Sequence, residues 1–358
     1  MEPLKGLILS GGAGTRLRPI THTSAKQLVP VANKPVLFYG IEALVEAGVE
    51  EIGIIIAPET GEEIREAAGD GSQFGAKITY IVQDEPAGLA HAVLTAEDFI
   101  GGSPFVMYLG DNLLADGLRG LVASFRESEP DALILLTPVS DPSSYGVAEL
   151  DGDHVVRLVE KPKDPPSDLA LVGVYLFGPQ IFAAARSLEP SWRGEYEITE
   201  AIQKLIEDGS KVQSEVVSGW WKDTGQLADM LEANRLVLEE IETRLEGEVD
   251  DSSRVEGRVV VEPGATIRGS VVRGPAVIGA GASIEDAYVG PYTSIGENVS
   301  IARSEIEHSI VLSGSTVADL DTRMEASLLG RDVKLTRSEG RPKTLQMLVG
   351  DKSEIKIV

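Results

Sequence analysis

The chain has no cysteine and only four histidines in 358 residues. The absence of thiols excludes disulfide bonds and thiolate-bound zinc, and the histidines lack the spacing of metal ligands. No apolar run reaches about 18 residues, and no basic segment followed by an apolar one opens the chain, so neither a membrane span nor a signal peptide is expected. These absences predict a cytoplasmic protein without a structural metal.

Basic residues are also scarce, because 32 Lys and Arg stand against 57 Asp and Glu, a formal net charge of −25. DNA and RNA are poor candidates as partners, since nucleic-acid binding depends on clustered basic residues. A small phosphate substrate would need a local reversal of this negative field by a few basic residues and a divalent cation. Each Lys or Arg in a glycine-rich loop is therefore a candidate site residue.

The first 246 residues alternate short apolar runs with segments of helical period, which predicts an α/β fold with a Rossmann-like mixed, mostly parallel sheet. The expected strands are residues 4–9, 52–57, 78–83, 105–109 and 133–137. A crossover helix is expected between Pro35 and Gly48. Antiparallel strands at 145–150 and 154–160 flank the loop Asp151-Gly152-Asp153, which reads as a hairpin.

Two further helices are expected at residues 197–208 and from 226 to about 245, with Thr224 as a candidate cap of the second. The acidic residues 246–253 read as a linker. The predicted domains are therefore residues 1–246 and 247–358.

After this linker, small aliphatic residues recur in steps of six, six and five, so that the pattern repeats every 17 residues. The series is Val255, Val261, Ile267, Val272, Ile278, Ile284, Val289, Ile295, Ile301, Ile306 and Leu312. One such residue at each corner of a triangular coil is the signature of a hexapeptide left-handed β-helix, with a regular β-sandwich as the alternative. Ala318 is a weak match and Arg323 is no core corner, so the β-helix is predicted to end near residue 323, capped by the tail.

The glycine-rich loop SGGAGTR, residues 10–16, directly follows the first expected strand, at the sheet edge where ligands bind. Its glycines let backbone amides approach a phosphate closely. Leu17 occupies the third glycine position of a dinucleotide motif, and no G-K-S/T sequence follows, which disfavours dinucleotide and P-loop sites. The cationic side chains of Arg16 and Lys26 suit a triphosphate tail.

Further motifs follow this loop in a fixed order along nearly the whole chain. They are GGxGTRLxP at 11–19, KQLxPV at 26–31, KP at 34–35, QxxPxGLA at 83–90, LGDN at 109–112, YGV at 145–147, EKP at 160–162, EYEIT at 195–199 and WxDTG at 221–225. With them the chain resembles the sugar-phosphate nucleotidyltransferases. The resemblance implies transfer of a thymidylyl group from dTTP to glucose 1-phosphate, with Mg²⁺ as cofactor and dTDP-glucose and pyrophosphate as products.

The resemblance also assigns residues to each substrate. It places the nucleotide on Leu9, Gly11, Gly12, Gly14, Thr15, Arg16, Gln83, Pro86, Gly88 and Asp111. It places the sugar phosphate on Leu109, Tyr145, Gly146, Glu160, Lys161, Val172, Tyr175 and Trp221. Arg16, Lys26 and Lys161 are the expected catalytic residues.

Asp111 follows an expected strand, so its carboxylate emerges at the same sheet edge as the glycine loop. Magnesium prefers one or two carboxylates plus phosphate oxygens and water, and the resemblance pairs Asp111 with Asp223 in that role. Without the resemblance, a helix cap and a turn former are the simpler interpretations of these two residues.

The sequence leaves alternatives open for the nucleotide and for the activity. UTP or GTP could replace dTTP, as in UDP-glucose or GDP-mannose pyrophosphorylases, and a non-catalytic regulatory subunit could keep the fold. His91 is expected to be structural, and His308 leaves an acyltransferase activity of the β-helix as a minor alternative. We expect the β-helix to assemble a homo-oligomer, a trimer or tetramer.

Overall fold

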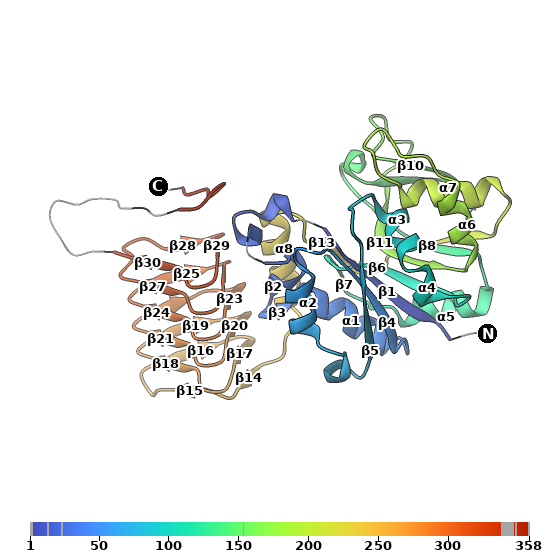
Figure 1. The fold of residues 1–358 in the computed structure, drawn as a ribbon. Coiled ribbons are helices and arrows are strands. Elements are labelled where there is room, and N and C mark those ends of the chain that lie inside the picture. Colours follow the sequence, from blue (N-terminus) through green and yellow to red (C-terminus); the bar gives the residue numbers. More distant parts are fainter. Residues whose placement is uncertain are drawn as a thin grey trace. The chain divides into compact units, whose positions relative to one another are not determined.

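The computed structural model describes residues 3–12, 14–22, 24–152, 154–337, 347 and 349–356 (Figure 1). The chain groups into two compact units. The first comprises Met1–Ala13, Ser24–Leu28 and Val36–Asp223, and the second comprises Gly14–Thr23, Val29–Pro35 and Thr224–Val358. Two short N-terminal segments thus belong to the unit that otherwise begins at Thr224. A domain boundary between residues 246 and 247 stays a prediction.

The first unit is built around a nine-stranded mixed sheet in the order β10-β9-β11-β6-β1-β4-β5, with β8 beside β11 and β12 beside β8. Strands β6, β1, β4 and β5 run parallel, whereas β11 is antiparallel to β6 and β8. The strands are β1 Lys5–Ser10, β4 Glu51–Ile56, β5 Lys77–Val82, β6 Phe105–Leu109, β8 Ala132–Pro138, β9 Gly146–Asp151, β10 His154–Glu160, β11 Leu169–Phe177 and β12 Val212–Val216. The five expected strands and the antiparallel hairpin β9–β10 are confirmed; Asp153 of its loop lies outside the described residues.

Helices cover both faces of this sheet. Successive residues of a strand point to opposite faces, so each strand supplies apolar side chains to both layers of helices. Leu7 and Leu9 of β1 pack with α3, α6 and α7, whereas Ile8 packs with α1, α2 and α5. The helices are α1 Val36–Glu46, α2 Gly61–Ala68, α3 Leu89–Thr95, α4 Glu97–Ile100, α5 Arg119–Ser128, α6 Gln180–Arg186 and α7 Ile198–Glu207. The crossover helix and the helix near 197–208 are thereby confirmed. None of the helices in the described ranges is long and apolar enough to cross a membrane.

Short elements complete the first unit. Strand β7, Asn112–Leu114, forms an antiparallel ribbon with β13, Trp221–Asp223. Single 3₁₀ turns are η3 Lys26–Leu28, η4 Ser72–Phe74 and η5 Pro142–Ser144.

Helix α8, Leu227–Leu238, opens the main part of the second unit and is shorter than expected. Its N-cap is Gln226, without a side-chain cap, so the prediction that Thr224 caps it is wrong. The expected end near residue 245 is also wrong, because Arg244 and Leu245 form strand β14, which pairs with β17. The pairing of Arg244 and Leu245 with β17 overrides the helical pattern of this segment.

The left-handed parallel β-helix is confirmed as three sheets of stacked, parallel short strands (Figure 1). Its strands are β14 Arg244–Leu245, β15 Glu248–Val249, β16 Arg254–Glu256, β17 Val259–Val261, β18 Thr266–Arg268, β19 Val271–Arg273, β20 Ala276–Ile278, β21 Ser283–Glu285, β22 Tyr288–Val289, β23 Thr293–Ile295, β24 Ser300–Ala302, β25 Glu305–Glu307, β26 Ile310–Val311, β27 Thr316–Ala318, β28 Met324–Glu325, β29 Leu328–Leu329 and β30 Lys334–Thr336. The aliphatic series from Val255 to Ile306 fills the interior or packs against it, as predicted, whereas Val311 takes the interior place expected for Leu312.

The expected end of the β-helix near residue 323 is wrong, because the repeat slips instead of stopping. Ile295 pairs with Val311, one residue before the expected Leu312, and Ile306 pairs with Met324, one residue after Arg323. Arg323 therefore lies on the outer surface, where it forms ion pairs with Glu305 and Glu307. The coils continue to β30.

The prediction that residues 246–253 form an acidic linker is also wrong, since Glu248 and Val249 form strand β15 beside β18. These residues belong to the first coil, whose other edge has no strand partner among the described residues. Charged side chains at an open edge disfavour pairing with another chain. The acidic residues 246–253 thus mark the first coil of the β-helix, at its open edge.

Candidate functional site

The end of β1 brings part of the glycine loop beside Gln83. Leu9 lies opposite Leu109 in the parallel register, so both predicted site residues end at the same sheet edge. A β-carbon on Gly11 would lie 3.3 Å from Gln83 Oε1, which shows how closely the loop approaches that amide. Gln83 Nε2 lies 2.9 Å from His91 Nδ1, so His91 fixes the amide. A nucleobase edge could therefore meet a positioned amide here.

Lys26 and Asp111 form a short ion pair in the first unit. Burial alone would raise the pKa of Asp111, but the Lys26 ammonium and hydrogen bonds from Lys26 and Asn112 lower it below its usual value. A β-carbon on Gly12 would lie 3.3 Å from Lys26 Cε, so the loop, the ammonium and the carboxylate adjoin one another. The Asp111 carboxylate is therefore ionised, and it already attracts one cation, the Lys26 ammonium.

Asn112 fixes the Asp111 carboxylate, a role that the sequence reasoning missed. Its Nδ2 donates to Asp111 Oδ1 at 3.0 Å, and its Oδ1 accepts from the Trp221 indole at 2.6 Å and the Gly173 amide at 3.2 Å. The amide is almost completely buried, so these bonds replace its hydration. Its place directly after Asp111 in the LGDN motif was the available signal.

Asp223 reaches the same place through the ribbon of β7 and β13, where it lies opposite Asn112 in register. The predicted pair Asp111 and Asp223 is therefore brought together from distant parts of the sequence. Among the described residues no group of three or more acidic or histidine side chains could hold a metal alone. Two carboxylates that leave other positions to phosphate and water fit Mg²⁺, which dehydrates reluctantly.

Glu160 and Lys161 lie where β10 ends, beside the start of β9. Lys161 Nζ lies 3.5 Å from Glu160 Oε1, and the Lys161 amide donates to the Tyr145 carbonyl at 2.9 Å. Gly146 lies opposite Glu160, and a β-carbon there would lie 2.5 Å from Thr199 Cγ2. Any larger residue would therefore fill the space in front of Glu160.

Arg193 is a second cation of this cluster that the sequence reasoning missed. Its guanidinium lies 3.3 Å from both Glu160 Oε1 and Glu197 Oε1 and 2.9 Å from Glu195 Oε2. Burial raises the pKa of Glu197, and the Glu160 charge raises it further. A lone arginine two residues before the EYEIT motif carries no periodic signal, so only the fold reveals it.

A continuous path of contacts connects the two halves of the site. Trp221 bonds to Asn112 and packs edge-on against Tyr145, with ring centroids 5.6 Å apart. Tyr145 in turn accepts the Lys161 amide through its carbonyl. One constellation within the first unit thus contains members of both expected sets: Gly11, Gly12, Gln83 and Asp111 for the nucleotide, and Tyr145, Glu160, Lys161 and Trp221 for the sugar phosphate.

The remaining predicted site residues differ in burial and in the unit to which they belong. Val172 and Tyr175 are buried in the two sheet cores, and burial together with the Glu160 charge raises the Tyr175 pKa. Pro86 is exposed before α3. Gly14, Thr15 and Arg16 belong to the second unit. Their roles stay predictions.

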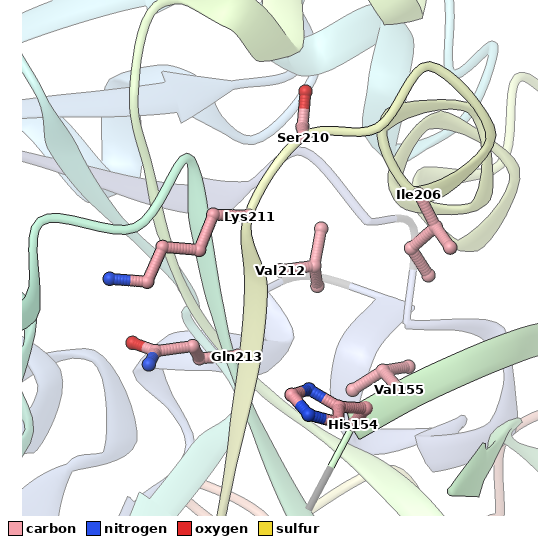
Figure 2. Close-up of a pocket in the computed structure, with 7 residues that line it drawn as sticks. All are labelled: His154, Val155, Ile206, Ser210, Lys211, Val212 and Gln213. Atoms are coloured by element: carbon pink, nitrogen blue, oxygen red, sulfur yellow. The ribbon is translucent and has the colours of Figure 1, made fainter. Parts of the chain in front are cut away.

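A pocket of about 230 Å³ in the first unit involves none of the predicted site residues. Figure 2 shows that His154 and Val155 of β10, Ile206 of α7 and the segment from Ser210 to Gln213 line it. The Lys211 ammonium donates to the Ser128 carbonyl, and Gln213 accepts from the Ser128 hydroxyl. Two of its polar side chains thus bond to other residues of the protein.

Comparisons with known proteins agree with this geometry. Residues 5–240 match the nucleotidyl transferase family. The chain is 56% identical over 356 residues to a glucose-1-phosphate thymidylyltransferase from Streptomyces antibioticus and 54% identical over 355 residues to one from Streptomyces griseus, each covering 99% of both chains. A solved structure from Bacillus anthracis, described as a glucose-1-phosphate thymidylyltransferase in complex with a sucrose, is 36% identical with a TM-score of 0.63 and covers 67% of this chain and 97% of its own. The chain therefore belongs to the nucleotidyl transferase family.

Proposed function

We propose that this protein transfers a thymidylyl group from dTTP to glucose 1-phosphate, forming dTDP-glucose and pyrophosphate. The observation that carries the proposal is the unbroken path from Gln83 and the Lys26–Asp111 pair to Lys161 and Arg193. Relatives that share more than half of their residues with this chain, over its whole length, bear the name of that activity.

The acceptor phosphate meets the cluster around Glu160. Lys161 and Arg193 supply positive charge for the 1-phosphate, while Glu160 accepts hydrogen bonds from sugar hydroxyls. Gly146 leaves room for the sugar beside Glu160. A phosphate oxygen is already a nucleophile at neutral pH, so no protein base or covalent intermediate is needed.

The nucleotide meets the glycine loop. Gln83 offers a donor and an acceptor to the pyrimidine, the amides of Gly11 and Gly12 approach the phosphates, and Lys26 and Arg16 neutralise the triphosphate charge. Catalysis consists of aligning two anions in line and offsetting their repulsion. Asp111 and Asp223 would hold Mg²⁺, which when bound offsets charge on the triphosphate.

The direct test is pyrophosphate release from glucose 1-phosphate with dTTP, UTP, GTP, ATP and CTP in turn, with and without Mg²⁺. We expect the highest kcat/KM with dTTP, only in the presence of the metal ion. A higher value with UTP or GTP would replace the thymidylyl proposal with the corresponding alternative. No release with any nucleotide, by a folded protein that contains Mg²⁺, would favour a non-catalytic subunit.

Gly88 provides a test of the nucleotide side. It has φ of 105°, and a β-carbon there would lie 2.5 Å from the Tyr196 carbonyl oxygen. Gly88→Ala should displace the segment next to Gln83 and raise KM for dTTP about tenfold, since such strain costs on the order of 1–3 kcal/mol. KM for glucose 1-phosphate should change little. Gly120→Ala is the control, because its β-carbon meets no atom within 4 Å.

The homo-oligomer and the cytoplasmic location stay predictions. Light scattering of the intact protein measures the first directly. A monomer at micromolar concentration would contradict the expected trimer or tetramer.

A further inference from the structure

The loop that carries Arg16 has its own compact structure within the second unit. It contains two 3₁₀ turns, η1 Thr15–Leu17 and η2 Ile20–His22. The Thr21 hydroxyl donates to the Gly14 carbonyl at 2.6 Å and closes the loop. Arg16 is exposed, whereas Leu17 and Thr21 are buried. The loop thus presents its arginine from a small packed base.

One support of this base is the last coil of the β-helix. A β-carbon on Gly330, which directly follows β29, would lie 3.4 Å from Ile20 Cδ1. Ordinary van der Waals contact begins at about this distance. The final coil therefore approaches Ile20 so closely that a side chain larger than a methyl group at residue 330 would press against it.

A second support, of residues 29–35 and not of the Arg16 loop itself, lies in the hairpin of β2, Pro30–Val31, and β3, Lys34–Pro35. Asn33 at its tip has φ of 64°, and its Nδ2 donates to the Ile295 carbonyl of β23 at 2.7 Å. This contact attaches the hairpin to the middle of the β-helix.

Asn234 of α8 reinforces the second support. Its side chain is fully buried and accepts from the Ala32 amide at 2.9 Å and from the Ser294 hydroxyl at 2.7 Å, while it donates to the Tyr292 carbonyl at 3.0 Å. One amide thus joins the hairpin, the helix and a β-helix coil. A buried amide with all these partners specifies a single arrangement.

We propose that the β-helix positions the catalytic loop, with Ile20 and Asn33 as positioning residues that fix Arg16 for the triphosphate. The proposal rests on the assignment of Arg16 to the nucleotide made above. The segments on either side of Lys26, residues 14–23 and 29–35, group with the β-helix, whereas Lys26 itself groups with the sheet. The Arg16 loop thus belongs to the unit that contains its support, the last coil of the β-helix.

The first test varies the contact between Ile20 and Gly330. Ile20→Ala removes the packed side chain, and Gly330→Leu forces a larger one against it. Both should lower kcat and raise KM for dTTP, on the order of tenfold to a hundredfold for an ångström-scale misplacement. KM for glucose 1-phosphate should stay constant, and Ile20→Val should restore most activity. Gly120→Leu is the matched control, at a glycine that no atom approaches.

The second test uses two turn asparagines of left-handed conformation. Asn33→Gly keeps the backbone but removes the bond to Ile295, so it should show the same loss specific to the nucleotide. Asn298→Gly, at φ of 55° in a β-helix turn, is the control and should be neutral. Wild-type kinetics for Ile20→Ala, Gly330→Leu and Asn33→Gly would overturn the proposal, as would equal rises in both KM values. An inactive wild type would instead overturn the proposed function.

Discussion

Lys161→Ala should lower kcat for dTDP-glucose formation on the order of a hundredfold to a thousandfold, the usual loss when one preorganised charge is removed from a transition state. The ammonium lies 3.5 Å from Glu160, so its removal would leave the attacking phosphate beside a carboxylate that has lost one of its two nearby cations, with Arg193 remaining. KM and Kd for dTTP should remain close to wild type, because Lys161 lies in the half of the constellation assigned to the sugar phosphate. Steady-state kinetics with both substrates varied, together with calorimetric titration of dTTP, measures the two effects separately.

Lys163→Ala is the control for this variant, since Lys163 is exposed two residues farther along the same turn. It should keep wild-type kinetics. Lys161→Met tests the charge alone because it keeps the aliphatic stem, and it should lose as much activity as the alanine variant. Activity within threefold of wild type in both Lys161 variants would remove this residue from the mechanism.

Asp223→Asn should abolish most Mg²⁺-dependent turnover, also on the order of a hundredfold or more at a fixed metal concentration. Asp223 lies across the ribbon from Asn112, the residue that fixes Asp111, so it supplies the second carboxylate at this point. The amide keeps the shape but loses the charge that holds a hard cation. The Mg²⁺ concentration for half-maximal activity should rise strongly, and calorimetry of Mg²⁺ with dTTP present should show weaker binding.

Asp111→Asn should act similarly, with an added loss because Lys26 is left without its buried counter-charge. Asp116→Asn, at an exposed aspartate after β7, serves as the control. An unchanged metal requirement in both Asp223→Asn and Asp111→Asn would exclude these carboxylates as ligands.

Local patterns predicted the sheet, the crossover helix α1 and the β-helix, because buried strands and repeated coils impose a period on the sequence. The same reasoning failed where tertiary pairing overrides a local pattern. Arg244 and Leu245 continue a helical pattern but pair as a strand. The repeat shifts one residue early at Val311 and one residue late at Met324, and the second shift leaves Arg323 outside the core position. A fixed period extrapolates poorly past such a slip.

The site shows the same division between local and long-range information. Motif residues such as Asp111 and Lys161 adjoin the partners expected from their positions at strand ends. Arg193 was missed because its importance comes from the carboxylates it contacts and not from a pattern. Asn112 was missed although its place in the LGDN motif was a signal, because its role depends on long-range contacts with Trp221 and Gly173. The grouping of Arg16 with the β-helix likewise depends on a contact with Gly330, at the other end of the chain.

The contact between Ile20 and Gly330 also orders events during synthesis. The strands around β1 can pair once the first two-thirds of the chain has left the ribosome, and domains form largely in the order of synthesis. The base of the Arg16 loop, in contrast, lacks its partner until the final coil emerges. A nascent or C-terminally damaged chain would therefore hold a folded sheet while the base of the Arg16 loop still lacks this support, and full activity would come only with the last coil.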